Sequence, residues 1–490
     1  MASSPLNSPE GSLSGRNLSD TYLYTYKKET AWQAYQSDFF ENRRKKRLLQ
    51  KYVRVFLTVV IPGLLILGAW HLLGLDSFFK QGARQAILPP PGTETPQPPK
   101  TMPAKTIPPI TTLSKTGVSD LIRETRFLNA DKNVFFVDSQ DQQYTITTSL
   151  NTPLQKELIS AMNQLKTLDR GKPQQIAIIA MDPSNGNIVG MAGFDLGDPG
   201  INPCLASDYP AASIFKIVTA AAAIDSLGYS AHTPLYFNGN KYTLYKRQLT
   251  DDKNKYTTKI SLAGAFAESI NPIFGKIGKT YLEKGKLNAY AQAFGFNQRP
   301  DSELKFESGR FGVKENEFHL AELGCGYNHD TTISPVFGAM LVTTVLNAGT
   351  SFVPHIVNQV KTSMGDIIYT SKKETYATPI TPKTAQTMIE LMKTTIAKGT
   401  ARKSFHGISR DRTLSKLDIG GKTGSLYNRE RTVKYDWFTG FGKEKTGDKA
   451  LVMSIVVGHK KYIGTRASSY ARMILKTYFK DVSKAPAQKK

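Results

Sequence analysis

Serine and lysine side chains recur at a spacing that suits covalent acyl chemistry. Ser213-Ile-Phe-Lys216 stands at the start of an alanine-rich apolar run. Residues three apart share one face of a helix, so the hydroxyl and the amine would lie side by side. A serine at a helix N-terminus meets the positive end of the helix dipole, and a desolvated lysine can lose its proton near neutral pH. The pair could therefore be a nucleophile and its general base.

The same spacing also occurs where it predicts no catalysis. Ser77-Phe-Phe-Lys80 follows a long apolar segment directly, which fits an anchor to lipid headgroups. Spacing alone therefore does not identify a nucleophile, and further motifs are needed.

A second motif, Ser269-Ile-Asn271, interrupts an apolar helical stretch just before Pro272. Its hydroxyl and amide could face a reaction site. A helix end with local side-chain capping explains the tripeptide equally well, because serine and asparagine favour such ends.

The third motif is Lys422-Thr423-Gly424-Ser425, one of three Lys-Thr-Gly copies that begin at Lys115, Lys422 and Lys445. The Lys445 copy lies in a charged turn, where glycine is expected for geometric reasons. The Lys422 copy follows Asp-Ile-Gly-Gly and precedes Asp-Trp-Phe-Thr-Gly. It predicts an inner strand whose edge faces a cleft, offering a backbone N–H to an oxyanion and a lysine with two hydroxyls to a carboxylate.

The elements that must position these motifs form a mixed α/β pattern over the later part of the chain. Apolar runs at 175–180 and 188–192 flank a turn and predict a hairpin. Residues 214–227 predict a buried helix. Runs at 435–441 and 450–458 predict two strands joined by a polar turn, and 470–479 has helical apolar spacing.

Composition limits the class of protein. The chain has 490 residues, of which 40% are hydrophobic, and 38 are glycine, so a sizeable core is possible and collagen-like or wholly disordered classes are excluded. Two cysteines exclude both a cysteine-rich zinc module and a disulfide framework. The net charge of +24 suggests a polyanionic neighbour, which could be nucleic acid, anionic lipid or an anionic polymer.

Residues 55–75 predict a transmembrane helix. They contain no Asp, Glu, Lys or Arg, and at about 1.5 Å per residue they cross a core of roughly 30 Å. Seven cations precede them: Arg43, Arg44, Lys45, Lys46, Arg47, Lys51 and Arg54. The positive-inside rule then places the N-terminus in the cytoplasm and the rest of the chain outside. The alternatives are a cleaved signal peptide and a nucleic-acid patch at 43–47.

The remaining segments follow from composition. Residues 1–54 predict a cytoplasmic tail, and 76–115 a proline-rich stalk with nine prolines between Pro89 and Pro109. Residues 116–170 predict a linker or short pedestal, 171–480 the main domain, and 481–490 a basic tail.

In this order along the chain, the three motifs resemble the transpeptidase domain of penicillin-binding proteins, whose signatures are serine-x-x-lysine, serine-x-asparagine and lysine-threonine-glycine. The likeness covers roughly residues 144 to 480. It includes further stretches at 147–155, 179–193, 324–335, 399–403 and 437–440. Two positions depart from the common pattern. Ser425 stands where many members have threonine, and Cys325 where a polar residue is frequent. A disulfide of Cys325 with Cys204 and two unpaired buried cysteines remain equally open.

The resemblance implies a central antiparallel sheet flanked by helices, and it implies a role for each motif residue. Ser213 would be acylated and Lys216 would be its base. Ser269 would relay a proton to the leaving D-alanine, and Asn271 would hold the acyl-side amide. Lys422 would supply positive charge while Thr423, Gly424 and Ser425 bind the terminal carboxylate. The backbone N–H groups of Ser213 and Ser425 would form the oxyanion hole.

The resemblance also implies partners and a location. The substrates would be D-Ala-D-Ala stem peptides of peptidoglycan, with β-lactams as inhibitors. No cofactor, metal or nucleic acid is expected, since the seven histidines form no ligand spacing. About 60 residues between stalk and domain leave no room for a glycosyltransferase domain, so a separate glycan polymerase and other cell-wall synthesis proteins would be partners. The chain would be a single-pass inner-membrane protein with a periplasmic or extracellular catalytic domain.

Four other functions fit the same motifs. A D,D-carboxypeptidase would pass the acyl group to water, and a β-lactamase would hydrolyse the β-lactam adduct. A β-lactam sensor would use the site as a receptor, although 54 residues cannot house a cytoplasmic protease. A catalytically idle cell-wall scaffold is the non-enzymatic alternative.

Overall fold

The computed structural model describes residues 112–314 and 316–481. Residues 1–111, which include the predicted tail, transmembrane segment and most of the predicted stalk, lie outside these, as do 315 and 482–490. Within the described residues, no helix combines the length and the apolar character needed to span a bilayer.

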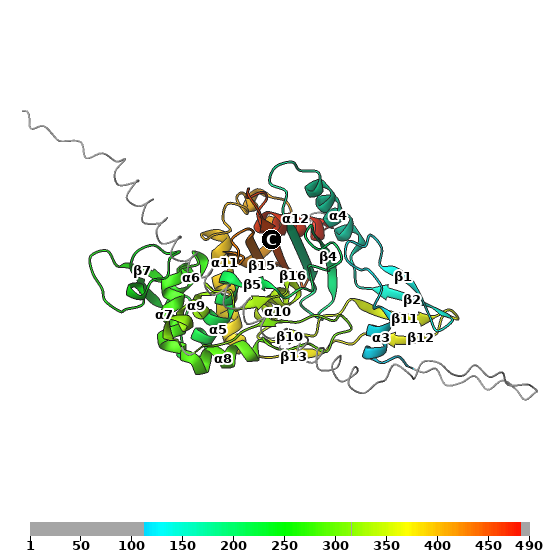
Figure 1. Cartoon of the computed structure of the whole chain (residues 1–490), viewed down its shortest axis with the longest axis horizontal. Coiled ribbons are helices and arrows are strands. Elements are labelled where there is room, and N and C mark those ends of the chain that lie inside the picture. The colour runs from blue at the N-terminus through cyan, green and yellow to red at the C-terminus, as the bar shows by residue number, and fades with distance from the viewer. Residues whose placement is uncertain (1–111, 315, 482–490) are drawn as a thin grey trace, which may run out of the picture. The chain divides into compact units, whose positions relative to one another are not determined.

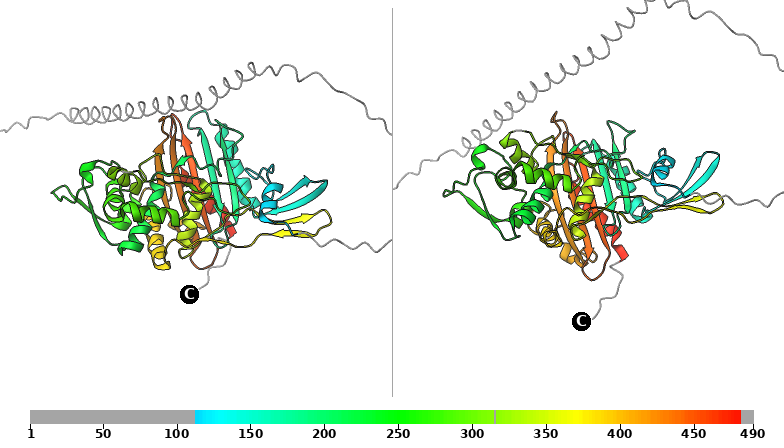
Figure 2. Two further views of the ribbon diagram at one scale, coloured as in Figure 1. Left: turned by 60° about the horizontal axis from the view of Figure 1, so that its bottom comes forward. Right: turned by 90° about the horizontal axis from the view of Figure 1, so that it is seen from below.

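A five-stranded antiparallel sheet forms the centre of the fold. Its strands stand in the order β14 (Leu417–Tyr427), β15 (Lys434–Glu444), β16 (Ala450–His459), β3 (Gln175–Met181) and β4 (Ile188–Asp195). Figure 2 shows the three C-terminal strands beside the two earlier ones, although more than 220 positions separate the end of β4 from the start of β14. The predicted hairpin at 175–192 and the predicted strands at 435–441 and 450–458 are confirmed.

Both faces of this sheet are buried, which explains why its strands are almost continuously apolar. Ile176 and Ile178 of β3 pack with helices α4 (Thr152–Lys166) and α12 (Ala467–Tyr478) in one core cluster. Ala177 and Ile179 pack on the other face with α10 (Pro335–Leu346) in a second cluster. Alternate residues of a strand point to opposite faces, so both sets must be apolar. The helix predicted at 470–479 is confirmed as α12, which begins three residues earlier and ends one residue earlier.

Helices on the β14 side form the second part of the fold, at the left in Figure 1. They are α5 (Lys216–Leu227), α6 (Leu262–Ala267), α7 (Asn271–Lys276), a π-helix (Ile277–Leu282), α8 (Glu283–Ala293), α9 (Glu317–Cys325) and α11 (Pro382–Ala397). Helix α11 packs against β14, α6 and α5. The helices that carry the first two motifs therefore lie next to the strand that carries the third.

Smaller sheets complete the chain. The four-stranded sheet has the order β1 (Val134–Ser139), β2 (Gln142–Thr148), β11 (Val357–Thr362) and β12 (Ile367–Thr370). Three smaller ones pair β5 (Tyr209–Pro210), β9 (Thr332–Ile333) and β8 (Gly309–Arg310); β6 (Pro234–Phe237) and β7 (Thr258–Ser261); and β10 (Ser351–Phe352) and β13 (Thr375–Ala377). Lys115 begins helix α3 (Lys115–Leu121) and forms ion pairs with Asp301 and Glu374.

The prediction that the Lys422 motif lies on an inner strand is wrong. Strand β14 is an edge strand, paired only with β15 in the sheet. Apart from Asp418, the run Leu417-Asp-Ile-Gly-Gly is buried, because α11 and the turn around Ser213 cover the strand and not because a second strand does. In the sequence, an edge strand covered by a helix and a turn therefore has the same apolar pattern as an inner strand. The edge position has a chemical consequence, because an unpaired strand edge presents backbone N–H groups to a ligand.

Candidate active site

Ser213 lies on a tight turn immediately before helix α5. A 3₁₀ turn spans Ala212–Phe215, and the α-helix itself begins at Lys216. The predicted helix start near Ser213 is therefore confirmed, with a 3₁₀ turn as its first turn. Ala212 has a left-handed backbone with φ of +48°, which is uncommon for a residue with a Cβ and marks backbone strain. Ser213 is half-buried, whereas Ile214 and Phe215, which follow it within the turn, are fully buried.

The side-chain nitrogen of Lys216, Nζ, occupies the centre of the site. It lies 2.7 Å from Ser213 Oγ, 2.8 Å from Asn271 Oδ1 and 2.5 Å from the backbone carbonyl oxygen of Cys325. The Lys216 side chain is completely buried. Burial lowers the pKa of Lys216 to about 8, because a charged amine loses its hydration there.

This contact set fits a neutral lysine. A neutral amine has two N–H donors and one lone pair. The two donors match the oxygen atoms of Asn271 and Cys325, which only accept, and the lone pair then faces the Ser213 hydroxyl. In that state Lys216 can accept the proton of Ser213 when the serine attacks an electrophile.

The Ser269-Ile-Asn271 motif joins two short helices, as its interruption of the apolar pattern predicts. Ser269 has a φ of +59° between α6 and α7, and Asn271 is the first residue of α7. The amide of Asn271 is oriented from two sides: Oδ1 accepts from Lys216, and Nδ2 donates to the carbonyl of Tyr242 at 2.9 Å. The Asn271 backbone N–H donates to the carbonyl of Lys241. The segment 241–242 therefore fixes the second motif in place.

Lys422 connects the second motif to the third. Its side chain is completely buried, and its Nζ donates to Ser269 Oγ at 2.9 Å and to the backbone carbonyl of Thr423 at 2.8 Å. Burial, and after it the positive charge of Lys216, hold the pKa of Lys422 well below its usual range. A positive charge on Lys216 thus disfavours protonation of Lys422, whereas an anion bound beside Lys422 would favour it.

The remaining motif residues lie along the open edge of β14. A side chain at Gly424 would come within 3.2 Å of the Ser213 backbone nitrogen, so the strand and the serine turn pack closely. Thr423 contacts the hydroxyl of Thr400, and Ser425 is exposed. The next strand is tied to the same turn, because Trp437 Nε1 donates to the carbonyl of Pro210 at 3.0 Å. All three motifs thus converge on one place.

Residues 324–326, which lie outside the three motifs, also form part of the site. The carbonyl of Gly324 accepts from Thr219, and that of Cys325 accepts from Lys216. Gly326 has a φ of +73°, and a Cβ there would collide with the carbonyl oxygen of Ala212. The stretch 324–335 was part of the family resemblance. Its contact with Lys216 could not be predicted, because a backbone carbonyl is present in every residue whatever its side chain.

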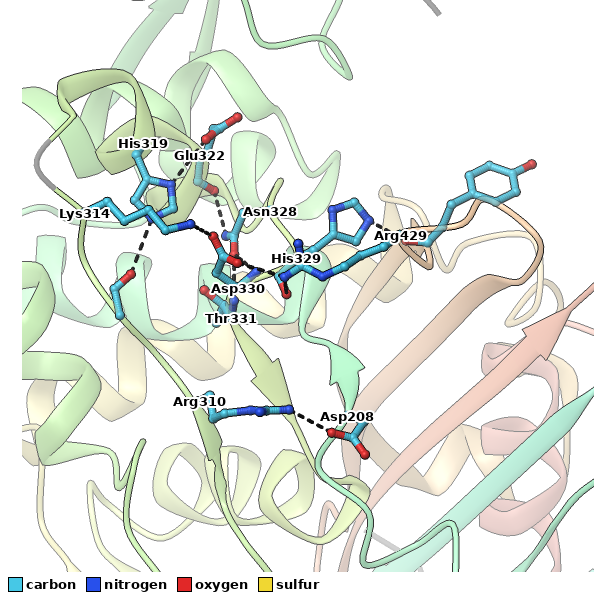
Figure 3. A network of polar contacts seen from close by, with 12 residues as sticks. Asp208, Arg310, Lys314, His319, Glu322, Asn328, His329, Asp330, Thr331 and Arg429 are labelled. Atoms are coloured by element: carbon cyan, nitrogen blue, oxygen red, sulfur yellow. Dashed lines mark hydrogen bonds and ion pairs between the residues drawn. The ribbon is translucent and has the colours of Figure 1, made fainter. Parts of the chain in front are cut away.

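The loop after α9 is joined to the far end of β14 by a polar network (Figure 3). Asp330 forms ion pairs with Lys314 and with Arg429, the latter at 2.8 Å. Arg429 also donates to the carbonyl of His329, and His329 Nε2 lies 2.8 Å from the carbonyl of Tyr427. Burial alone would raise the pKa of Asp330, but hydrogen bonds from the two cations lower it to about 2. The network joins the loop that follows Cys325 to the strand that carries Lys422.

The two cysteines are not bonded to each other. Both are free and fully buried, which decides between the two alternatives left open by the sequence. No cluster of three or more histidine, cysteine, aspartate or glutamate side chains that could hold a metal ion occurs among residues 112–314 and 316–481.

Two curated proteins are similar to this chain in sequence. Stage V sporulation protein D of Bacillus subtilis is 24% identical over 347 residues, which cover 66% of this chain and 50% of that protein, so the chain spans about half the length of that relative. The peptidoglycan D,D-transpeptidase PbpA of Mycolicibacterium smegmatis is 22% identical over 373 residues, covering 68% and 71%.

Solved structures give the same fold. The crystal structure of PBPA from Mycobacterium tuberculosis aligns with a TM-score of 0.55 at 20% identity, covering 69% of this chain and 82% of that one. The ceftriaxone acyl-enzyme complex of penicillin-binding protein A from M. tuberculosis aligns with a TM-score of 0.54 at 21% identity, covering 68% and 79%. The sequence model for the penicillin binding protein transpeptidase domain matches residues 176–480. This chain therefore belongs to the penicillin-binding protein transpeptidase family.

Proposed function

We propose that this protein is a membrane-anchored D,D-transpeptidase that cross-links peptidoglycan stem peptides through an acyl-enzyme on Ser213. The observation that carries the proposal is the position of Lys216 Nζ, buried and within hydrogen-bonding distance of both Ser213 Oγ and Asn271 Oδ1. A buried amine of lowered pKa next to a half-buried hydroxyl is the arrangement that an activated serine requires.

In the acylation step, Ser213 Oγ attacks the carbonyl carbon of the penultimate D-alanine while Lys216 takes the hydroxyl proton. The backbone N–H groups of Ser213 and Ser425 would bind the oxyanion; losing one such donor typically costs about 3 kcal/mol. The peptide C–N bond then breaks. Ser269, which accepts a hydrogen bond from Lys422, would pass a proton to the nitrogen of the departing D-alanine.

The substrate would be held by the two sides of the site. Lys422 with the hydroxyls of Thr423 and Ser425 would bind the terminal carboxylate, because the close approach of Gly424 to the Ser213 turn puts this edge beside the nucleophile. Asn271 Nδ2 has a second hydrogen besides the one that bonds Tyr242, and that hydrogen would hold the acyl-side amide.

In the second step, a stem-peptide amine attacks the ester carbonyl of acylated Ser213. The amine loses a proton to Lys216, the new amide forms, and Ser213 regains its hydroxyl. β-Lactams would acylate the same serine. In support, similar solved structures of penicillin-binding protein A from M. tuberculosis are acyl-enzyme complexes with ceftriaxone and penicillin G.

Covalent labelling and product analysis test the chemistry. Labelled penicillin should attach to Ser213, so Ser213→Ala should abolish labelling while Ser77→Ala, in the other Ser-x-x-Lys copy, should leave it intact. With a pentapeptide substrate, mass spectrometry should find a cross-linked product only when an acceptor amine is present. Labelling that persists in Ser213→Ala rejects the nucleophile. If a tetrapeptide forms in the same amount with and without the acceptor amine, the chain is a carboxypeptidase. If no substrate gives any product, the chain is an idle scaffold.

The membrane anchor and orientation form a separate part of the proposal, supported by the uncharged segment 55–75 and the seven cations before it. A cysteine introduced at Gly92 should react with a thiol reagent that does not cross membranes when spheroplasts are intact. Reaction only after the membrane is broken would reverse the orientation. A catalytic domain outside the cytoplasm would then meet its substrate and its separate glycan polymerase in the periplasm or at the cell surface.

A further inference from the structure

A cavity lies behind the helix that begins with Asn271. Its volume is about 360 Å³, and it is lined by β6, by residues 251–253, by α7 and by the π-helix Ile277–Leu282. Helix α7 lies at the left in Figure 1. The volume falls within the range of small-molecule sites. A π-helix is rare in proteins and occurs frequently at functional sites.

The cavity and the serine–lysine cluster lie on opposite sides of α7. Ile273 and Lys276 line the cavity, whereas Asn271 contacts Lys216. At about 100° per residue, Ile273 and Lys276 both point roughly opposite to Asn271. A ligand in the cavity would therefore sit about one helix diameter, roughly 10 Å, from the site without competing for it.

Three tyrosines supply most of the recognition chemistry. Tyr229, Tyr236 and Tyr281 line the cavity, and in the described part of the chain none of their hydroxyls is bonded to another residue. Burial and the neighbouring charge of Asp251 raise the pKa of Tyr281, so its hydroxyl stays protonated and can donate. Each ring also offers an apolar face beside its polar tip.

The charges of the lining nearly cancel. Asp251 and Asp252 supply two carboxylates, and Lys253 and Lys276 supply two ammonium groups. Lys276 is buried and bonded to Asp251 at 3.1 Å, while Lys253 lies 4.0 Å from the ring centroid of Tyr236. An anionic ligand would meet the two carboxylates, and a purely apolar ligand would leave the three phenol hydroxyls without partners. A neutral ring with many hydroxyls satisfies both conditions, since its C–H face packs on an aromatic ring and its hydroxyls reach the carboxylates.

We propose that this cavity binds one or two pyranose rings of a glycan and that, resting on the function proposed above, the glycan is the amino-sugar backbone of peptidoglycan. Holding the glycan chain beside α7 would keep its stem peptides near Ser213 and raise their effective concentration there.

Calorimetric titration of the full chain tests the site. The ligands are a soluble β-1,4-linked N-acetylglucosamine tetramer and peptidoglycan glycan strands freed of peptide. Both should bind saturably, and Tyr281→Ala and Tyr236→Ala should each weaken binding at least tenfold. Tyr281→Phe, which keeps the ring, should weaken it less. Tyr256→Ala is the matched control, because Tyr256 is 74% exposed and does not line the cavity, and it should bind like the native chain.

Penicillin labelling of the same variants separates this inference from the proposed function. All of them should label at the native rate, because no cavity tyrosine contacts the serine–lysine cluster among the described residues. Absence of saturable binding by the native chain, or native affinity in both alanine variants, overturns the glycan site. Equal affinity for a glucose tetramer overturns its assignment to amino sugars. A chain that binds the glycan strands but never labels with penicillin would retain this site and lose the proposed reaction.

Discussion

The Nζ atom of Lys216 lies 2.5 Å from the backbone carbonyl oxygen of Cys325, a residue 109 positions later in the chain. The carbonyl, and not the thiol, makes this contact. Its position is fixed by the close packing of its two glycine neighbours, since a Cβ at Gly324 would collide with the backbone of Gly278 and one at Gly326 with the backbone of Ala212.

This relationship predicts opposite results for two neighbouring substitutions. Cys325→Ala keeps the carbonyl, so penicillin acylation should stay within about threefold of native, with a loss of about 1 kcal/mol in the free energy of unfolding for the buried sulfur. Gly326→Ala should slow acylation at least a hundredfold and destabilise by about 1–3 kcal/mol, because alanine is strained at its positive φ and displaces Ala212. Labelling kinetics and thermal unfolding measure both. Equal rates in the two variants would contradict the carbonyl's role.

The pH dependence of acylation should report Lys216. Burial lowers its pKa to about 8, and only the neutral amine can accept the Ser213 proton. Below that pKa the amine is protonated, so the second-order acylation rate should rise about tenfold per pH unit and level off above about pH 8. Stopped-flow measurements between pH 6 and 9.5 would show this limb. Lys216→Arg, which stays protonated, should lose the reaction at every pH. A flat native profile between pH 6 and 9 would assign the base elsewhere.

The network around Asp330 should affect the geometry of the site without altering its base. Asp330→Asn removes the ion pair with Arg429, which joins the loop after Cys325 to the end of β14, and the pair with Lys314, which joins it to the segment before α9. We expect acylation to slow about three- to tenfold with an unchanged pH midpoint. Partly exposed pairs each contribute about 1 kcal/mol at most. The matched control is Asp208→Asn, which removes the Arg310 pair seen in the same view (Figure 3). The same slowing in both variants would point to a general charge effect.

The penicilloyl adduct on Ser213 should be long-lived. Class A β-lactamases hydrolyse such esters with a water that a glutamate activates. Eight glutamates lie between the second and third motifs. Glu374 pairs with Lys115, and four others are also engaged elsewhere. Glu303 is buried and accepts from the backbone of Ile356 and Val357, and Glu307, Glu317 and Glu322 pair with Arg299, Lys279 and His319. Glu315 lies outside the described residues.

Intact-mass time points after rapid acylation measure this lifetime. The adduct should persist orders of magnitude longer than the acylation step takes, and Glu303→Gln should not lengthen it further. Regeneration of free enzyme within seconds, with release of penicilloic acid, would place the chain with the β-lactamases.

Local sequence determined the chemical groups and the elements that carry them. The serine-lysine pair at 213–216 could be identified because side-chain type and helical spacing are properties of a few adjacent residues. The same holds for the hairpin at 175–195, whose apolar runs and polar turn are contiguous. The family likeness over roughly 144–480 extended this to the order of the motifs, and the match at 176–480 agrees with it.

The tertiary structure decided what depends on neighbours distant in the chain. β14 is an edge strand because no strand pairs with its second side in the sheet. The sequence does not show this, because a strand buried by helix α11 has the same apolar pattern as a strand buried by another strand. The lowered pKa of Lys216 requires complete burial by segments that begin more than fifty residues away. The contact of the Cys325 carbonyl with Lys216 could not be predicted from the sequence, because every residue has a backbone carbonyl. Only the folded chain determines which carbonyl meets the Lys216 amine.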